Sequence, residues 1–279
     1  MDWITALNKA VDYIEENILS DITCDSVADQ VHVSSYHFQR TFTILTGLPV
    51  GEYIRNRRLS LAGQELLDKK NKIIDTALKY RYETPESFNR AFKRFHGISP
   101  VQARKEGANL KSYNRLYLKL IMAGGNLLDY RIVTKAAFEV VVTSRKFSSE
   151  NYDIDIVGFW QEYKAAGLLE KVCGEFGIRI YPENNTKEYE YCIGCRTVYA
   201  KEITDIYKKV EIPAHTWAIF KCFGPMPASI QQLWCRIYTE WLPQARYELL
   251  NTCDIEYYTN GDTEAPDYYS EVWIPVKPI

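Results

Sequence analysis

The feature that most constrains this chain is an internal repeat near its start. The pattern Phe-x-Arg-x-Phe occurs at residues 38–42 and again at 88–92. A glycine followed closely by a proline occurs at 47–49 and again at 97–100, at the same interval. The separation between the copies, from residue 38 to residue 88, is typical of stacked copies of one supersecondary unit, but two copies are too few for a solenoid. The repeat therefore predicts a duplicated helical module.

The first copy predicts a helix-turn-helix. Thr23 is the expected cap of a short helix, and Ser34 is expected to cap the next one because its hydroxyl can accept from a free backbone N–H. The second helix has an apolar stripe and a separate face without acids, whose side chains are of the kinds that contact base edges and phosphates. A short helix, a turn and a helix with such a face form a helix-turn-helix. The residues expected to contact DNA from this copy are Tyr36, Gln39, Arg40 and Thr43.

The second copy repeats this pattern. Thr84 and Pro85 supply a cap and a first-turn proline, and three phenylalanines between 88 and 95 are expected in the core. Residues 51–69, between the copies, predict one helix about 27 Å long. That length approaches the roughly 34–36 Å between successive major-groove segments, so one chain is expected to contact two neighbouring grooves. The residues expected to face DNA from the second copy are Glu86, Asn89, Arg90 and Lys93.

The local charge supports a nucleic-acid partner although the whole chain has a net charge of -2. Residues 36–105 hold fourteen Lys and Arg against six Asp and Glu, a balance of +8. A basic patch is the electrostatic footprint of DNA binding. The alternative is that Arg40 and Arg90 are ordinary solvated arginines, and their recurrence at one position of the repeat favours the DNA role.

The composition changes near residue 110, which predicts a second domain. Of the 38 aromatic residues, 27 lie after residue 108. This part has β-type runs, for example at 189–199 and 217–223, and helical patterns at 155–166 and 229–241. The predicted fold is therefore multi-domain, with an all-α domain followed by an α+β domain. The predicted boundaries are 1–108 for the first domain, 109–115 for a linker and 116–279 for the second domain.

The repeated module resembles the DNA-binding domain of AraC/XylS-type transcription regulators. The resemblance covers about 100 residues and implies two helix-turn-helix units that bridge one DNA site. Arg81 departs from the family, whose second turn usually has glycine at this position, and His32 occupies the equivalent place in the first turn. A positive φ there would be strained for an arginine. The motifs that carry the resemblance are Ala28…Ser34-x3-Phe38-x-Arg40-x-Phe42, Gly47-x-Pro49, Tyr53-Ile54, Phe88-x-Arg90-x-Phe92-Lys93 and Gly97-Ile98-Ser99-Pro100.

The second part resembles GyrI-like effector-binding domains over about residues 116–279. The resemblance implies two β-α-β-β halves related by a pseudo-twofold axis, with a small-molecule site in the groove between them. It also implies that Trp160 and Trp234 are matching helix residues, and that Glu256 occupies the position of a glutamate that meets lipophilic cations. The motifs that carry it are Tyr130–Val133, Tyr191–Gly194, Ile212-Pro213-Ala214-His215, Trp241-Leu242-Pro243, Asp254-Ile255-Glu256-Tyr257 and Trp273-Ile274-Pro275-Val276.

Glu256 is also a candidate site residue on its own chemistry. It is an acid between two apolar residues of a predicted strand, in an aromatic-rich domain, which suits a desolvated cation site. We expect it to be buried without a fixed cation partner, which would disfavour its charged form until a cationic ligand binds. The alternatives are a surface acid paired with a lysine, and core packing for the aromatic residues. The residues expected to bind an effector are Glu256, Trp160, Tyr163, Tyr191, Trp217, Tyr258 and Tyr268.

Other chemistries find little support in the sequence. Cys192 and Cys195 would lie on opposite faces of a strand, and the four histidines lack zinc-like spacing. No phosphate-binding glycine loop or nucleophile elbow is visible. With seven cysteines and no visible signal peptide or membrane span, we expect reduced thiols in the cytoplasm, with no cofactor, metal or structural disulfide.

These observations predict a cytoplasmic transcription regulator. Its expected partners are double-stranded DNA, a small effector that is cationic or aromatic, and RNA polymerase, but no membrane. Two alternatives stay open. In the first alternative, the second domain is a hydrolase with Glu256 as general acid or base. In the second alternative, it is a protein-interaction module without a ligand.

Overall fold

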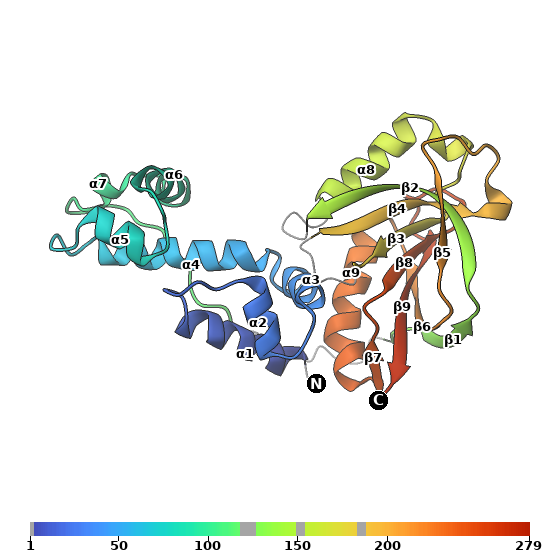
Figure 1. Ribbon diagram of the computed structural model, residues 1–279, viewed down its shortest axis with the longest axis horizontal. Helices are drawn as coiled ribbons and strands as arrows, with labels where there is room; N and C mark the ends of the chain where they lie inside the picture. Colours follow the sequence, from blue (N-terminus) through green and yellow to red (C-terminus); the bar gives the residue numbers. More distant parts are fainter. Residues whose placement is uncertain (1–2, 118–126, 149–153, 183–187) are drawn as a thin grey trace. The chain divides into compact units, whose positions relative to one another are not determined.

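The computed structural model describes residues 3–117, 127–148, 154–182 and 188–279. They belong to two compact units, which meet in the sequence between Lys119 and Leu120 (Figure 1). The first unit is helical, and the second is built on one antiparallel sheet. This confirms the predicted fold class. Within the described residues, no helix is both long and apolar enough to span a bilayer.

The first unit contains two helix-turn-helix pairs, α2–α3 and α5–α6, joined by the long helix α4. The predicted caps are present, because the hydroxyls of Thr23, Ser34 and Thr84 each accept from a backbone N–H three residues later. Helix α4 is shorter than expected and ends at Glu65, so it spans about 24 Å. The helices are α1 (Trp3–Glu16), α2 (Cys24–Gln30), α3 (Ser35–Thr46), α4 (Val50–Glu65), α5 (Ile73–Lys79), α6 (Pro85–His96) and α7 (Pro100–Ala103).

The turns inside the two pairs have the same backbone conformation. His32 has a φ of 56° and Arg81 a φ of 67°, both in the left-handed region. Each follows the end of a short helix, and the next residue's N–H returns to a helical carbonyl, as from Val33 to Ala28. This helix ending is normally made by glycine because other residues are strained there. The positive φ considered for Arg81 is therefore present, and His32 at the equivalent place of the first turn shares it.

Replacing His32 by glycine should stabilise the first unit. The left-handed conformation costs a residue with a Cβ about 1–2 kcal/mol, and glycine avoids this cost. Glycine loses more backbone entropy on folding, however, which offsets about 0.5–1 kcal/mol of the stabilisation. We expect His32→Gly to raise the free energy of unfolding by about 0.5–1 kcal/mol in urea denaturation. His32→Ala is the matched control, because alanine keeps the Cβ. Equal stability of the two variants would refute the strain.

Residues 110–115 of the predicted linker pack against the first unit, together with Leu116, which was expected to begin the second domain. The N–H of Tyr113 donates to Ser60 Oγ at 2.9 Å, and Arg57 donates to the Tyr113 carbonyl. Leu110 packs against the core of the second helix-turn-helix pair. We call residues 110–116 the strap. They differ from a linker because their backbone finds hydrogen-bond partners on α4.

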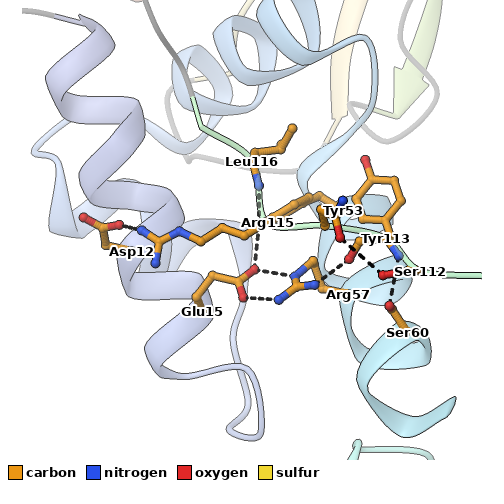
Figure 2. A network of polar contacts seen from close by, with 10 residues as sticks. Asp12, Glu15, Tyr53, Arg57, Ser60, Ser112, Tyr113, Arg115 and Leu116 are labelled. Carbon is orange, nitrogen blue, oxygen red and sulfur yellow. Dashed lines mark hydrogen bonds and ion pairs between the residues drawn. The ribbon is translucent and has the colours of Figure 1, made fainter. Parts of the chain in front are cut away.

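The strap also meets the ion pair that joins α1 to α4 (Figure 2). Arg57 Nη2 lies 2.6 Å from Glu15 Oε2, and the Tyr53 hydroxyl donates to Glu15 Oε1 at 2.6 Å. The N–H of Leu116 donates to the same Tyr53 hydroxyl at 3.3 Å. Burial alone raises the pKa of Glu15, but the hydrogen bonds from Arg57 and Tyr53 outweigh it, so the pKa of Glu15 is lowered. One polar network therefore ties together α1, α4 and the strap.

A buried histidine fixes the strap to α6. His96 Nδ1 accepts from the N–H of Lys111 at 3.1 Å, and its Nε2 lies 3.0 Å from the Leu59 carbonyl. This pairing requires the neutral ring with its hydrogen on Nε2. Burial lowers the pKa of His96, which favours that neutral form. The strap thus contacts α4 and α6 as well as the network at α1.

The second unit consists of two β-α-β-β halves in one sheet, as the resemblance implied. The halves are β2–α8–β3–β4 and β6–α9–β8–β9, and the sheet order is β1-β6-β9-β8-β3-β4-β2-β5, with β7 beside β9. The strands are β1 (Tyr130–Lys135), β2 (Phe138–Ser148), β3 (Phe176–Ile180), β4 (Glu188–Arg196), β5 (Lys208–Ile212), β6 (His215–Phe223), β7 (Tyr247–Leu249), β8 (Cys253–Tyr258) and β9 (Tyr269–Pro278). The helices are α8 (Ile154–Ala165) and α9 (Ala228–Arg236).

The halves meet where β3 pairs with β8. Ile178 and Ile255 are the central pair of this antiparallel ladder, so the pseudo-twofold axis passes between them. Rotation about that axis exchanges Arg179 with Glu256, because each follows its isoleucine by one residue. One face of the sheet carries an apolar core that includes Ile178, Ile255 and Trp273. Arg179 and Glu256 lie on the other face, since side chains alternate along a strand.

Candidate DNA interface and effector site

Helix α6 presents the predicted DNA-facing residues to solvent. Its start is fixed by Thr84, whose hydroxyl accepts from the Ser87 N–H at 3.1 Å, and by Pro85 in the first turn. Phe88 and Phe92 are fully buried and hold the helix against α4 and α5. The side chains on the exposed face are Glu86, Asn89, Arg90 and Lys93.

A basic cleft lies beside this face. It has a volume of about 470 Å³ and is lined by Arg55 of α4, by Arg90 and Arg94 of α6, and by Tyr82, Ser87 and Ala91. All three arginines are exposed, and no carboxylate of the described residues forms an ion pair with them. Three guanidinium groups around one cleft repel each other unless an anion lies between them. This arrangement suits DNA phosphate, which arginine binds through paired N–H donors.

Sequence reasoning found only one of the three arginines. Arg94 lies four residues after Arg90 on α6, so helical spacing could have found it. Arg55 belongs to α4 and reaches the cleft through the packing of two helices, which no local pattern shows.

Helix α3 differs from α6 in the exposure of its predicted DNA-facing residues. Tyr36, Gln39 and Arg40 are buried, with Arg40 only 1% exposed, and Thr43 is half-buried. The hydroxyl of Thr43 donates to the Gln39 carbonyl of its own helix at 2.8 Å. A base contact requires accessible side chains, so a DNA role for this face stays a prediction.

Glu256 is buried, as expected, at 4% exposure, but it has a fixed cation partner. Arg179 Nη1 donates to Glu256 Oε1 at 2.9 Å and lies 3.6 Å from Asp254 Oδ1. Arg179 is itself 4% exposed. The expectation of a carboxylate without a fixed cation was therefore wrong. A single sequence could not show it, because Arg179 lies in the other half and meets Glu256 only through the pairing of β3 with β8.

Aromatic donors from both halves converge on this ion pair. Trp234 of α9 donates its indole N–H to Glu256 Oε1 at 2.9 Å. Trp160 of α8 donates to the Tyr191 hydroxyl at 2.9 Å, and Tyr191 donates to Glu256 Oε2 at 3.2 Å. The resemblance implied that Trp160 and Trp234 are matching helix residues, and in the structure both belong to this one cluster.

The tyrosines of the cluster act as neutral donors. Tyr258 donates to Glu256 Oε2 at 3.1 Å, and its ring packs edge-on to Trp160 with centroids 5.3 Å apart. Burial, and then the charge of Glu256, raise the pKa of Tyr191 and that of Tyr258 well above the ordinary value. The structure therefore brings together four of the residues expected to bind an effector, namely Glu256, Trp160, Tyr191 and Tyr258.

The other three predicted effector residues have different contacts. The Tyr163 hydroxyl donates to the Val172 carbonyl at 2.6 Å, although its ring lies beside Trp160. Tyr268 donates to the Thr259 carbonyl at 2.8 Å. Trp217 packs against Trp273 in the core on the opposite face of the sheet. A strand side chain points to one of the two faces of the sheet, and the register of strand pairing places Trp217 on the face opposite the proposed effector residues.

Gly177 is the register partner of Glu256 and leaves room for this cluster. A Cβ at Gly177 would stand 2.2 Å from the Tyr191 hydroxyl oxygen, and Tyr191 is fully buried. Gly177→Ala should therefore displace Tyr191 and lower the free energy of unfolding by about 1–3 kcal/mol, as overpacking does. Gly158→Ala on α8 is the matched control, because nothing lies within 4 Å of its Cβ. The control should gain up to about 1 kcal/mol from helix propensity. Urea unfolding compares them, and equal effects would contradict the packing argument.

The comparisons with known proteins agree with this architecture. The family described as integron-associated effector binding protein matches residues 131–276, and the family described as helix-turn-helix domain matches residues 27–106. The Right origin-binding protein of Escherichia coli K12 is 33% identical over 293 aligned positions, which cover 99% of this chain and 100% of that protein. This chain belongs to the AraC-type transcription regulators with a GyrI-like effector-binding domain. Both resemblances drawn from the sequence are confirmed.

Two further relatives each match one part of this AraC-type regulator. The HTH-type transcriptional activator AarP of Providencia stuartii is 37% identical over 112 residues, which cover 40% of this chain and 81% of AarP. A solved structure of SAV2435 bound to tetraphenylphosphonium has a TM-score of 0.47 and 20% identity. It covers 53% of this chain and 94% of SAV2435.

Proposed function

We propose that this regulator contacts DNA through the exposed face of α6 together with the cleft formed by Arg55, Arg90 and Arg94. The observation that carries this assignment is the cleft itself, in which three exposed arginines converge and no described carboxylate pairs with them. Asn89 and Lys93 lie on the same exposed face and extend the surface. Phosphate contacts of this kind position a protein on DNA, and neighbouring side chains then contact bases.

The test uses the full-length protein and the 25-bp duplex that it enriches from a random library, measured by fluorescence anisotropy over a salt series. If Arg90 contacts a phosphate, Arg90→Ala should weaken binding to the selected and to a scrambled duplex alike. The slope of log affinity against log salt should fall by roughly 1. Arg55→Ala and Arg94→Ala should behave similarly.

Lys105→Ala is the control, because Lys105 is exposed and lies outside the cleft. Unchanged slopes for all three arginine variants would show that the cleft does not contact DNA, even if the wild-type protein binds. Failure of the wild type to enrich any duplex would reject the DNA-binding assignment as a whole.

We infer that the effector site is the cluster of Glu256, Trp160, Tyr191 and Tyr258, with Arg179 and Trp234 as further members. The aromatic surround suits an aromatic, amphipathic compound, and the acid suits a cationic one. Since Glu256 already pairs with Arg179, a cation that reaches it must displace that guanidinium. Binding would therefore rearrange side chains of α8, α9 and both central strands, and so alter promoter output through DNA affinity or through RNA polymerase.

The contacts of Glu256 favour binding over hydrolysis. Its two oxygens accept from Arg179, Trp234, Tyr191 and Tyr258. These donors stabilise the charged carboxylate and occupy its acceptor positions, whereas a general acid or base must exchange its proton with a substrate. We therefore propose that the second unit is a sensor rather than an enzyme, acting in the cytoplasm where DNA is available.

A matched pair of compounds tests the effector assignment. Tetraphenylphosphonium is a lipophilic cation, and triphenylphosphine oxide is a neutral compound with similar rings. An effector at 100 times its Kd should stabilise the full-length protein by about 2.7 kcal/mol in a thermal-shift assay. Glu256→Gln should weaken the cation selectively, and equal losses for both compounds would leave Glu256 without a role in charge selection. If neither compound shifts the melting temperature of the wild type, the proposed aromatic effector class is wrong.

A further inference from the structure

Asp254 is a buried carboxylate that the proposed effector site does not use. It lies directly opposite Arg179 in the register of β8 and β3. The Tyr181 hydroxyl donates to Asp254 Oδ2 and so orients the carboxylate. Its other oxygen, Oδ1, lies 3.6 Å from Arg179 Nη1. A second acid therefore stands beside the guanidinium that pairs with Glu256.

Two carboxylates thus share one guanidinium. Arg179 Nη1 lies 2.9 Å from Glu256 Oε1, so it is hydrogen-bonded to Glu256 and only close to Asp254. A movement of roughly 0.7 Å toward Asp254 Oδ1 would bring that separation to the usual hydrogen-bond length of about 2.9 Å. With both acids ionised, the three side chains carry one negative charge in excess. A second cation at Glu256 would therefore leave each carboxylate with a partner of opposite charge.

The Arg179 guanidinium already has the surroundings of a cationic ligand. Its central carbon lies 5.4 Å from the centroid of the Tyr191 ring and 6.0 Å from that of the Trp234 ring. These separations are within the range of cation–π contacts. A carboxylate surrounded by aromatic rings is also the environment that we propose for the effector. Arg179 is therefore an internal competitor of a cationic effector.

We propose that Asp254 is a positioning residue, which receives Arg179 when a cationic effector pairs with Glu256. Without effector, the guanidinium is hydrogen-bonded to Glu256, as in the structure. With effector, it turns to Asp254, and neither the arginine nor a carboxylate is left buried without a partner. An unpaired buried charge is costly, so this second partner makes displacement of the arginine feasible. The inference rests on the effector site proposed above and adds where the displaced arginine goes.

The exchange would be felt by α9. Glu256 Oε1, the oxygen that Arg179 would leave, also accepts from the Trp234 indole N–H at 2.9 Å. The guanidinium that moves is the one close to the Trp234 ring. Transfer to Asp254 would therefore change the contacts of the helix that carries Trp234, and the movement needs no change in the pairing of β3 with β8.

Unfolding of the full-length protein tests this exchange without any ligand. Arg179→Met and Asp254→Asn form a double-mutant cycle, which is measured with Glu256 and again with Glu256→Gln. The glutamine variant imitates a carboxylate whose charge a ligand has neutralised. The coupling of Arg179 with Asp254, expressed in the unfolding equilibrium constant, should rise at least about tenfold in the glutamine background. Equal coupling in both backgrounds would show that Arg179 does not transfer.

A crystal structure of Glu256→Gln gives a second measurement that needs one variant only. A guanidinium nitrogen of Arg179 should lie about 2.9 Å from an Asp254 carboxylate oxygen, because a carboxylate accepts from guanidinium more strongly than an amide does. A guanidinium that keeps its bond to residue 256 would overturn the proposal. This structure decides the question even if Arg179→Met fails to fold.

Calorimetry with tetraphenylphosphonium extends the test to the bound state. Asp254→Asn should weaken binding at least about tenfold in the wild type but less than about threefold in Arg179→Met, where no guanidinium needs a new partner. Equal losses in both backgrounds would mean that Asp254 acts through its charge alone, and would refute the transfer.

Glu271→Gln is the control for charge at a distance. Glu271 is a buried carboxylate paired with Arg131 at 2.8 Å, and it shares a face of β9 with the core residue Trp273. It therefore lies on the face opposite Arg179, and its loss should change the affinity less than about threefold. If the wild type does not bind tetraphenylphosphonium, the proposed effector class is wrong, and the unfolding cycles and the crystal structure still decide the exchange.

Discussion

A fragment of residues 1–119 should be stable, whereas one that ends at 108 should lose about 3–5 kcal/mol of unfolding free energy. The shorter fragment lacks the strap, and with it four hydrogen bonds that hold α4 and α6, each worth about 0.5–1.5 kcal/mol. It also exposes the core that Leu110 covers. We therefore propose that the DNA-binding domain extends beyond the boundary expected from composition.

Urea denaturation and DNA binding of the two fragments check this expectation. Arg115→Ala within 1–119 is the control, since the ion pair of Arg115 with Asp12 is only partly buried, with side chains 34% and 49% exposed, and such a pair is worth at most about 1 kcal/mol. The longer fragment should keep the salt dependence of DNA binding, and the shorter one should bind more weakly because less of it is folded. Equal unfolding midpoints for 1–108 and 1–119 would show that the strap contributes nothing to stability.

Loss of the Arg179 guanidinium should be the most damaging single change in the second unit. Arg179→Met removes the cation from a buried ion pair and leaves the charge of Glu256 behind, which typically costs about 3–5 kcal/mol. The same variant should bind tetraphenylphosphonium more tightly than the wild type, because the cation no longer competes with a guanidinium.

The double variant Arg179→Met with Glu256→Gln separates charge from packing. It has no unpaired charge at this position, so it should recover much of the lost stability. Unfolding of the full-length protein followed by tryptophan fluorescence measures both variants. If the double variant were as unstable as Arg179→Met, packing and not the buried charge would explain the loss.

The features that could be predicted from the sequence are those that depend on neighbours along the chain. The caps at Thr23, Ser34 and Thr84, the left-handed turn at Arg81 and the exposed face of α6 all follow from residues a few positions apart. The two β-α-β-β halves were implied by ordered motifs rather than by periodicity. Local chemistry therefore predicted the elements well.

The features that were missed depend on contacts between distant segments. Arg179 meets Glu256 because β3 pairs with β8, and Arg55 meets Arg90 because α4 packs on α6. The strap looked like a linker because its residues are polar, but that polarity serves hydrogen bonds to α4. Pairing and packing decide such cases, and a single sequence does not specify them.

The pseudo-twofold axis has a consequence for how such a domain can arise. The axis places Arg179 of one half where the other half has Glu256, and the two side chains meet across it at 2.9 Å. Two identical halves, as in a homodimer of a single β-α-β-β unit, would bring two arginines or two glutamates together there, and like charges at that distance disfavour each other's ionised form. A complementary pair requires two different sequences, which a duplicated and diverged single chain supplies. The salt bridge at the axis thus makes the fused chain, rather than a symmetric dimer, the smallest assembly that can hold this charged pair.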